Sequence, residues 1–574
     1  MLCITLSPIL KPIRFLAQAL AVCLLASACS PATSTPVVNT GSTSPTTTPT
    51  SGPTTTTIPL GRDCVRITGT SSTIDTGEPA TDAMFLSGEL FVCSDDVVVA
   101  SGDDLNGLAV GAQLAAALGG PLLLPHPQLA AEIGRLKPLH VHLIGDVEVL
   151  IPPETDVTRH DLEGAVELAR TTLGVTEVVQ LPAVPDASTV IETVDAIAAA
   201  DRVVTPGSPS TTATTADAVI DPSQVVAGLA SPTEAPAVWL VDAAEPATIL
   251  MAAGSGHVVG AQVLAFDATN ILGFPAVGSA LEGRPGEQVR FIGTAAATDS
   301  WEMRLLLSGK QLPGGGYRIL GDDTPNRYVA FYGHPSTAAL GVLGEQGPQA
   351  TLDRMAPFLT DYQADGHRTI PTFEILASVA SAVAGDGDYS SETAIDTLLP
   401  WIDLAEEQGA YVILDLQPGR DDFLTQAKMY EELLLRPHVG LALDPEWRLK
   451  PDQVHLEQVG RVDAAEVNTV VHWLADLVRD NGLPQKMLIV HQFREFMIQD
   501  RETLESRPEL QMVIQMDGQG PIPTKDTTWA ALTAGTEDNH WRWGWKNFFD
   551  EDSPTPTPEH TMGKQPVPVF VSYQ

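Results

Sequence analysis

The chain has 574 residues, and its 72 acidic and 32 basic side chains give a formal net charge of −40 at pH 7. Such an acidic surface repels nucleic acids, so a nucleic-acid partner is excluded. Hydrophobic residues make up 44% of the chain, enough to build cores, and the length predicts two or three domains.

The first 29 residues have the pattern of a secretory signal peptide. Lys11 and Arg14 precede an apolar run at 15–25, which ends in Leu-Ala-Ser-Ala directly before Cys29. The run is too short to be a spanning helix. The small residues before Cys29 resemble a bacterial lipobox. That resemblance implies a lipid on Cys29 and an anchored location on the outer face of the cell membrane, in the cell envelope. The alternative is ordinary cleavage after Ala28.

Residues 30–59 are almost wholly Ser, Thr, Pro, Gly and Val. A segment of this composition buries too little apolar surface to fold, so a disordered stalk is predicted. A lipid followed by such a stalk implies that the folded part stands off a membrane surface.

Two of the five cysteines, Cys3 and Cys23, leave with the signal peptide, and Cys29 would take the lipid. Cys64 and Cys93 remain. An exported compartment permits disulfides, so these two cysteines are predicted to form one bridge at the start of the first domain. The alternative, a reactive pair of thiols, lacks a nearby histidine or Cys-x-x-Cys spacing.

Strand-like and helix-like segments alternate in the region 60–320. Strands are expected at 97–102, 121–124 and 140–144, and helices at 108–118 and 129–136. This alternation is typical of an α/β unit. The segment 205–236, rich in Pro, Ser, Thr and Ala, is interpreted as a loop, and the Gly-rich segment 310–325 as the passage to the next domain.

An internal duplication is predicted in the same region. Gly-Ala-Gln occurs at 111–113 and at 260–262, and an apolar pair followed by glycine closes at Gly145 and at Gly293. The first and last glycines of the two copies are 34 and 33 residues apart. So close a spacing supports two degenerate copies of one unit.

Four segments of this region resemble the cell wall binding repeat type 2 family. They are Val-Val-Val-Ala-Ser-Gly-Asp-Asp at 97–104, Pro-Leu-Leu-Leu at 121–124, His-Leu-Ile-Gly at 142–145 and the Arg-containing segment 158–169. The resemblance implies noncovalent attachment to a cell-wall polysaccharide or peptidoglycan. The acidic surface has the wrong sign for an anionic wall polymer unless divalent cations bridge the two. A module that only spaces or dimerises the second half is the alternative.

The region 321–574 repeats a strand and helix pattern that is typical of a (β/α)8 barrel of the TIM type. Helices are expected at 398–408, 421–435 and 464–481. The expected strands are 328–332, 369–373, 411–414, 439–443, 487–490, 511–515, 541–545 and 567–571. The seventh can also be interpreted as a loop. The overall prediction is an α/β protein with duplicated repeat-like units followed by this barrel.

Several of these strands end on acidic residues, and the carboxyl ends of parallel strands face the ligand. Asp415, Asp444 and Glu446 are the candidate catalytic residues. Glycoside hydrolysis needs such carboxyl groups, one protonated to donate to the leaving oxygen and another ionised. The supporting residues are Glu374, His491 and Asp517. The candidate substrate-binding residues are Tyr332, His334, Gln492, Trp447 and Trp545, with Trp541 and Trp543 near the same strand end.

Four segments of this half resemble glycoside-hydrolase-like barrels of exported actinobacterial proteins. They lie at 328–333, 414–419, 443–447 and 569–573, and the acidic string of a chitinase-like barrel is absent from the sequence. The resemblance implies a lipid-anchored envelope protein with a carbohydrate-active barrel. The alternative is a noncatalytic surface lipoprotein that binds wall glycan. No metal or cofactor is predicted, because the sequence has no His-x-x-x-His, cysteine cluster, phosphate loop or dinucleotide motif.

Overall fold

The structure is a computed structural model that describes residues 64–65, 73–74, 76–181, 203–206, 237–267, 270–281, 288–293, 300–321, 324–363 and 366–574. The predicted signal peptide, Cys29 and the stalk lie outside these residues, as does nearly all of the predicted loop at 205–236. Among the described residues, no helix is both long enough and apolar enough to cross a membrane.

Two four-stranded parallel sheets lie in the chain before residue 300. The first has the order β3-β2-β4-β5, from Leu122–Leu123, Asp96–Ala100, His140–Ile144 and Asp156–His160. The second has the order β9-β8-β10-β1, from Gln262–Phe266, Val238–Asp242, Val289–Ile292 and Thr73–Ile74. A separate pair joins β6 (Val178–Leu181) and β7 (Val203–Pro206).

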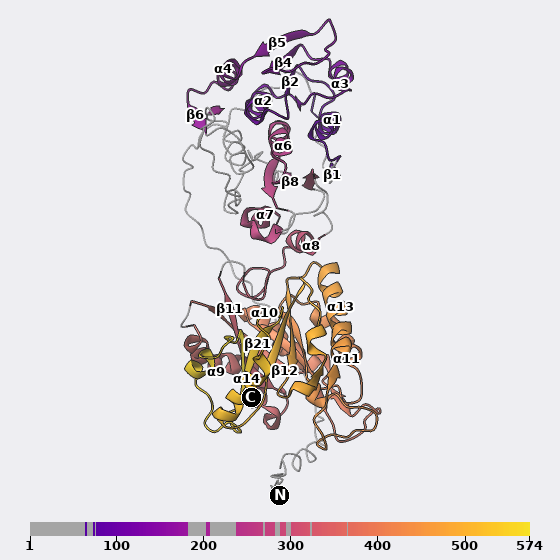
Figure 1. Cartoon of the computed structure of the whole chain (residues 1–574), viewed down its shortest axis with the longest axis vertical. Helices are drawn as coiled ribbons and strands as arrows, with labels where there is room; N and C mark the ends of the chain where they lie inside the picture. Colours follow the sequence, from indigo (N-terminus) through magenta and orange to yellow (C-terminus); the bar gives the residue numbers. More distant parts are fainter. Residues whose placement is uncertain are drawn as a thin grey trace, which may run out of the picture. The chain divides into compact units, whose positions relative to one another are not determined.

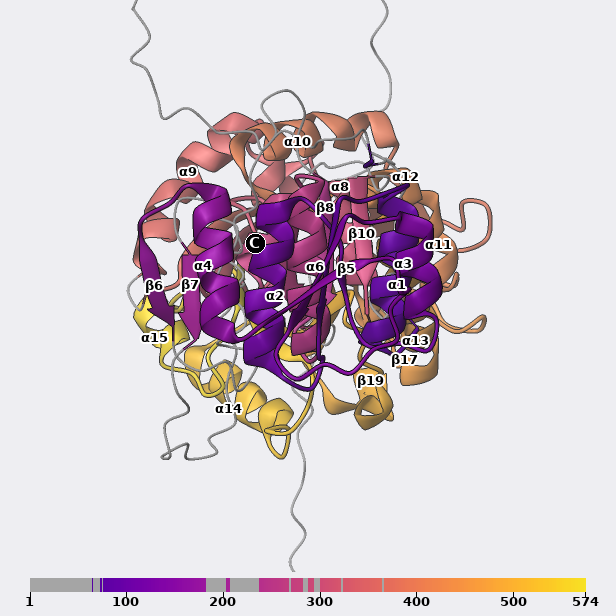
Figure 2. The ribbon, with the colours of Figure 1, turned by 90° about the horizontal axis from the view of Figure 1, so that it is seen from above.

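The helices that precede the barrel in sequence are short, and one of them is central. They are α1 (Pro79–Leu90), α2 (Leu105–Leu118), α3 (Leu129–Leu136), α4 (Leu162–Leu173), α6 (Pro246–Val258), α7 (Pro275–Leu281) and α8 (Trp301–Ser308). Helix α2 contacts both α4 and α6 (Figures 1 and 2). Its small apolar residues are buried from 107 to 117, so it is a core helix rather than an amphipathic surface helix.

The contact between α2 and α6 depends on a glycine. A Cβ atom added to Gly254 would lie 3.0 Å from the Cα atom of Ala112 and 3.1 Å from its carbonyl oxygen. Backbone atoms cannot move aside as the end of a flexible side chain can, so the two helices approach this closely only because residue 254 has no side chain.

We expect Gly254→Ala to lower the free energy of unfolding by about 1–3 kcal/mol, because overpacking between α2 and α6 outweighs the better helix propensity of alanine. The matched control is Gly134→Ala in α3, where an added Cβ would meet nothing within 4 Å. That change should raise the free energy of unfolding by about 0.5–1 kcal/mol. Urea unfolding of both variants measures these free energies. If both substitutions changed the free energy of unfolding in the same direction, the close packing of α2 and α6 at Gly254 would not be the cause.

The Gly-Ala-Gln match does not mark equivalent positions. Residues 111–113 lie inside helix α2, whereas Gly260 follows the end of α6 and Gln262 begins strand β9. That part of the predicted correspondence is therefore wrong, because three small or polar residues fit a helix interior as well as a turn. The later glycines occupy similar local positions: Gly145 and Gly293 directly follow β4 and β10, and both have a positive φ, 71° and 86°.

The predicted disulfide is confirmed. Cys64 and Cys93 are bonded, with their Cα atoms 4.8 Å apart and a sequence separation of 29. An isolated bridge from Val65 to Phe91 pairs the backbone beside it. The bond thus ties the first residue that the structure describes to the segment that follows α1.

The predicted barrel is confirmed: eight parallel strands close in the order β11-β12-β15-β16-β18-β20-β21-β22. They span Asn326–Gly333, Arg368–Leu376, Tyr411–Leu416, Val439–Leu443, Lys486–His491, Leu510–Met516, Arg542–Asn547 and Phe570–Tyr573. The principal helices around them are α9 (Pro348–Asp361), α10 (Ile395–Gln408), α11 (Phe423–Met429), α13 (Ala464–Asp480) and α14 (Ile522–Thr533) (Figure 1).

Two predicted elements of the barrel need correction. The last strand begins at Phe570 rather than at 567, because Pro568 has no N–H to give to a strand ladder. The helix predicted at 421–435 is divided at Tyr430 into α11 and α12 (Glu431–Leu434). The Tyr430 side chain is buried there, and its hydroxyl donates to the carbonyl oxygen of Thr393, 3.1 Å away.

Side chains that alternate along the strands fill the barrel interior. Its apolar layers include Tyr328, Ile370, Ile413, Ile489 and Phe570, all of them buried. Because residues two apart on a strand share a face, Tyr332, Glu374, Asp415 and His491 are inward positions two or four residues further toward the carboxyl ends. The interior is thus a packed apolar core below a polar layer.

A lysine lies buried at the first residue of β18. The Lys486 ammonium group donates to the carbonyl oxygens of Arg436 and Val439, at 2.7 and 2.6 Å, and the side chain has no exposed surface. Burial, together with the positive charge of Lys310, lowers the pKa of Lys486 to about 7.

We expect the stability of the protein relative to a Lys486→Met variant to rise with pH above about 7. Above this pH the unfolded chain binds a proton that the folded chain has lost. The unfolding free energy of the parent, relative to that of the variant, therefore increases by up to about 1.4 kcal/mol per pH unit until the lysine of the unfolded chain also loses its proton. Below the folded pKa both states are charged and the difference is constant. Chemical unfolding of both proteins at pH 6, 7.5 and 9 measures it. A difference that does not change with pH would contradict the lowered pKa.

Candidate active site at the carboxyl end of the barrel

Seven strands contribute polar side chains to one layer at the carboxyl end of the barrel. The layer consists of Tyr332, Glu374, Asp415, Asp444, His491, Asp517 and Lys546, none of which is more than 9% exposed. Their strands are distant in sequence, and the barrel register brings their ends together. We call this set the acidic cluster.

His491 lies at the centre of the acidic cluster. Its Nδ1 atom is 2.9 Å from Oδ2 of Asp517, and its Nε2 atom is 3.2 Å from Oε1 of Glu374 and 3.9 Å from Oδ1 of Asp415. The Nε2 contacts have ion-pair distances without the alignment of a hydrogen bond. A single imidazole therefore faces carboxylates from three other strands.

Asp415 is held by two further groups. The Tyr332 hydroxyl donates to Oδ2 of Asp415 at 2.9 Å. The Lys546 ammonium group lies 3.3 Å from the centre of the Tyr332 ring, on the side chain's aromatic face. This cation–π contact places a positive charge beside the carboxylates without a direct ion pair.

Asp444 and Glu446 occupy the turn after β16. Oδ1 of Asp444 accepts a hydrogen bond of 3.1 Å from the Glu446 backbone N–H, which caps the short 3-10 helix Pro445–Trp447. Arg448 pairs with Glu466 at 2.9 Å rather than with Glu446. Asp444 is buried, whereas Glu446 is only partly buried and is the acid nearest to solvent in this group.

The neighbours of His491 determine its charge state. Burial alone would lower the pKa of His491, but the negative charges of Asp415, Asp517 and Glu374 outweigh it and raise the pKa well above its usual value. The raised pKa favours the protonated, positively charged form of the His491 side chain.

The carboxyl groups shift in the direction expected of crowded, buried acids. Burial raises the pKa of Asp415, although His491 and Lys546 oppose the shift. Burial raises the pKa of Asp444 well above its usual value, with Asp415 and Asp517 adding to the effect. Burial and the charge of Asp517 raise the pKa of Glu446 to about 7. At that pKa the Glu446 carboxyl group is partly protonated near neutral pH.

Several polar atoms of the acidic cluster lack a hydrogen bond from the part of the chain that the structure describes. They are both carboxyl oxygens of Glu374, Oδ1 of Asp415, Nε2 of His491 and Oδ1 of Asp517. Buried polar atoms are ordinarily satisfied, and exceptions gather where a ligand or a reacting group binds. Asp444, His491 and Asp517 also each offer one possible metal-ligand atom, and these three atoms lie within 4.8 Å of one another.

The structure places the predicted catalytic and supporting residues in one region, but not all of the predicted substrate-binding residues. Trp545 has no exposed surface, and its indole N–H donates to Oδ1 of Asn547 at 2.9 Å. Trp541 and Trp543 are 3% and 4% exposed, so no face of these three rings is open to a sugar. In strand β21, Trp543 and Trp545 alternate with the inward positions, and both pack against Trp529 of helix α14.

Three other predicted substrate-binding residues have local partners. Gln492 accepts a hydrogen bond from Arg501 at 2.6 Å and supports its own loop. His334 is half-buried, and its Nε2 atom lies 3.0 Å from the Thr393 hydroxyl. Trp447 is half-buried beside His455, with ring centres 5.7 Å apart. Tyr332, by contrast, lies inside the acidic cluster.

Sequence reasoning missed Lys546. The alternation puts Gly544 and Lys546 on one face of a strand and Trp543 and Trp545 on the other, but it does not say which face points inward. The uncertain assignment of this strand also concealed Lys546. Gln515 was also missed, although it ends the predicted strand 511–515: its side-chain amide donates to the Ser572 hydroxyl at 2.6 Å inside the barrel.

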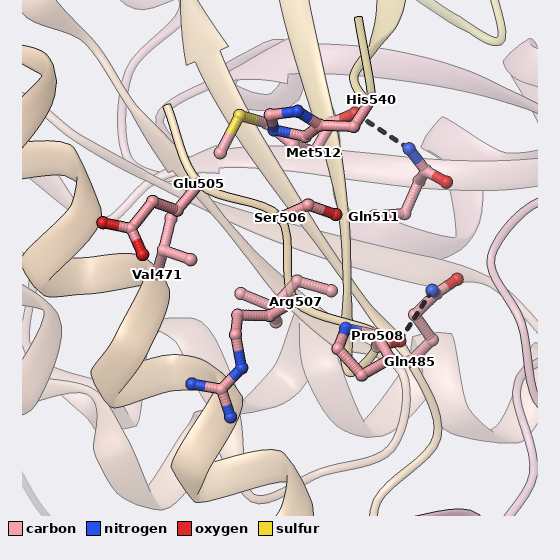
Figure 3. Close-up of a pocket in the computed structure, with 10 residues that line it drawn as sticks. Val471, Gln485, Glu505, Ser506, Arg507, Pro508, Gln511, Met512 and His540 are labelled. Carbon is pink, nitrogen blue, oxygen red and sulfur yellow. Dashed lines mark hydrogen bonds between the residues drawn. The ribbon is translucent and has the colours of Figure 1, made fainter. Parts of the chain in front are cut away.

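A cavity of about 160 Å³ lies at the other end of the barrel strands (Figure 3). Its lining includes Gln485, directly before β18, and Arg507 and Pro508, before β20. Gln485 donates to the carbonyl oxygen of Pro508 at 3.0 Å. The amino ends of the strands in such barrels serve stability, so this cavity is not the candidate active site.

Comparison with known proteins gives little. No family model matches the chain. No curated protein matches it either. Among solved structures, Cwp6 from Clostridium difficile aligns with a TM-score of 0.33 and 12% sequence identity, covering 60% of this chain and 62% of that protein, less than two thirds of its length. A similarity at this level carries no argument about fold or function.

Proposed function

We propose that the barrel is a carbohydrate-active hydrolase of the cell envelope that cleaves glycosidic bonds. The observation that supports this proposal is the convergence of four buried carboxyl groups, with the partly exposed Glu446, around His491 at the carboxyl end of a closed parallel barrel. Active sites of these barrels lie at this end. Glycoside hydrolysis needs carboxyl groups held in different protonation states, and crowding of buried acids supplies them.

Solvent exposure of the carboxyl groups suggests which of them has which role. Glu446 is the acid nearest to solvent, so it would donate the proton to the leaving oxygen of a bound glycan. Asp415, aligned by the Tyr332 hydroxyl at 2.9 Å, would be the ionised partner. Lys546 and His491 would limit the repulsion between the remaining carboxylates.

The region 60–320 would attach the protein to a cell-wall polysaccharide or peptidoglycan. The support is the resemblance to cell wall binding repeats, together with two parallel sheets of matching strand order, β3-β2-β4-β5 and β9-β8-β10-β1. A duplication of one unit would account for that match. Lipid attachment at Cys29 belongs to the same proposal, and Cys29→Ala followed by membrane fractionation tests it.

A noncatalytic surface protein is the second candidate, and a specific observation favours it. Glu374, Asp415 and His491 have no exposed surface, and Asp444 already caps the following turn. Buried charged groups can also have a purely structural role, in which they specify the fold and take no part in catalysis.

Incubation of the purified protein with a panel of wall and envelope glycans separates the two candidates. Release of new reducing ends supports the hydrolase. Binding of the protein to isolated cell walls without any such release supports the noncatalytic function.

A further inference from the structure

We propose that Asp444, His491 and Asp517 bind one divalent transition-metal ion at the carboxyl end of the barrel. The three residues come from the ends of β16, β18 and β20, which are adjacent in the barrel. This site goes beyond the proposed function, and it does not require that the barrel hydrolyse a glycan.

The distances match those of a coordination shell. Ligands on opposite sides of a divalent ion, with bonds of about 2.1–2.4 Å, are separated by about 4.2–4.8 Å, and neighbouring ligands of the smaller ions by about 3 Å. The three ligand atoms lie within 4.8 Å of one another, and Nδ1 of His491 is 2.9 Å from Oδ2 of Asp517. The side chains are therefore already placed for one shared cation.

A second observation points independently to a ligand. Oδ1 of Asp517 is buried and accepts no hydrogen bond from the described residues, and the Asp517 side chain is only 6% exposed. A buried carboxylate oxygen without a donor is costly, and a cation beside it would remove the cost.

The surroundings of His491 resemble those of a metal-binding histidine. With Nδ1 on the ion, the Nε2–H group faces Oε1 of Glu374 at 3.2 Å and Oδ1 of Asp415 at 3.9 Å. Histidines that bind metals ordinarily donate their other ring N–H to a carboxylate, which fixes the tautomer and the ring orientation. Tyr332 in turn donates to Asp415, so this outer group is itself held in place.

The donor set selects the class of ion. One imidazole and two carboxylates suit Mn²⁺, Co²⁺ and Zn²⁺, whereas Ca²⁺ and Mg²⁺ prefer oxygen ligands alone. The sequence offered no motif for this site, because its ligands are separated by 47 and 26 residues rather than by one helical turn.

Co²⁺ titration of the full-length protein, after dialysis against a chelator, tests the proposal through the visible absorption of bound Co²⁺. We expect saturation at one ion per chain, displacement by Zn²⁺ and no displacement by Ca²⁺. Asp517→Asn and His491→Gln should each weaken binding by about 100-fold or more, and Glu374→Gln by about 10–100-fold, as for outer-shell partners. Because none of these readouts is activity, failure of this proposal and failure of the hydrolase proposal are distinguishable.

Two control variants locate the ion. Asp526→Asn alters another aspartate beside a histidine, with Oδ1 2.9 Å from Nε2 of His560, and should leave binding unchanged. His160→Gln alters the rival group in the first sheet, where Nε2 of His160 is 3.1 Å from Nδ1 of His142. Loss of binding in His160→Gln with retention in Asp517→Asn overturns the proposal, as does the absence of any bound Co²⁺. If His491→Gln fails to fold, the Co²⁺ affinities of Asp517→Asn and Glu374→Gln still test the proposal.

Discussion

Replacement of Glu446 by glutamine is expected to lower the turnover of a glycan substrate by about 100-fold or more, the usual cost of losing a general acid. Glutamine keeps the size of the side chain but cannot donate a proton to a leaving oxygen. Substrate binding should change much less, so the loss should appear in kcat rather than in KM. Initial rates of reducing-end release by both proteins measure the effect.

The matched control is Glu466→Gln. Glu466 accepts from Arg448, two residues from Glu446, at 2.9 Å, so its replacement perturbs the same turn without touching the acidic cluster. Turnover by this variant should stay within a few-fold of the parent. If Glu446→Gln also stays within a few-fold, Glu446 is not the acid and the assignment fails.

Asp552→Asn is expected to lower the free energy of unfolding by about 3–5 kcal/mol, the cost of leaving one charge of a buried pair without its partner. Asp552 and Lys525 have no exposed side-chain surface, and Nζ of Lys525 lies 2.6 Å from Oδ2 of Asp552. Asp552 also accepts from the backbone N–H groups of Gly520 and Phe548, at 2.8 and 2.9 Å. The carboxylate thus joins α14, the turn before it and the end of β21.

Chemical unfolding of three variants tests this pair. The double variant Lys525→Met with Asp552→Asn should lose less stability than Asp552→Asn alone, because no buried charge then remains unpaired. Asp526→Asn, at a pair that is about one third exposed, should cost less than about 1 kcal/mol. A double variant no more stable than the single one would show that the lost backbone contacts, rather than the stranded charge, cause the effect.

The candidate site was predictable where it depends on local pattern. Asp415 and Asp444 end apolar runs of strand length, and Glu374 and His491 directly follow two other predicted strands, 369–373 and 487–490. The roles of the aromatic residues were not predictable. Trp545 and Lys546 are neighbours in one strand, and only the barrel register decides that the lysine enters the acidic cluster and the tryptophan packs outside.

The sequence by itself determined most of the elements and the disulfide. Apolar runs bounded by Pro and Gly mark buried strands, and Cys64 and Cys93 were the two cysteines left to pair with each other, because both signals depend on composition and short-range geometry. The tertiary structure alone decided which side chains meet. Closure of the barrel brings Asp444, His491 and Asp517 within 4.8 Å, although 73 residues separate the first from the last. It also placed Gly254 against Ala112, since helix packing depends on contacts that no local pattern specifies.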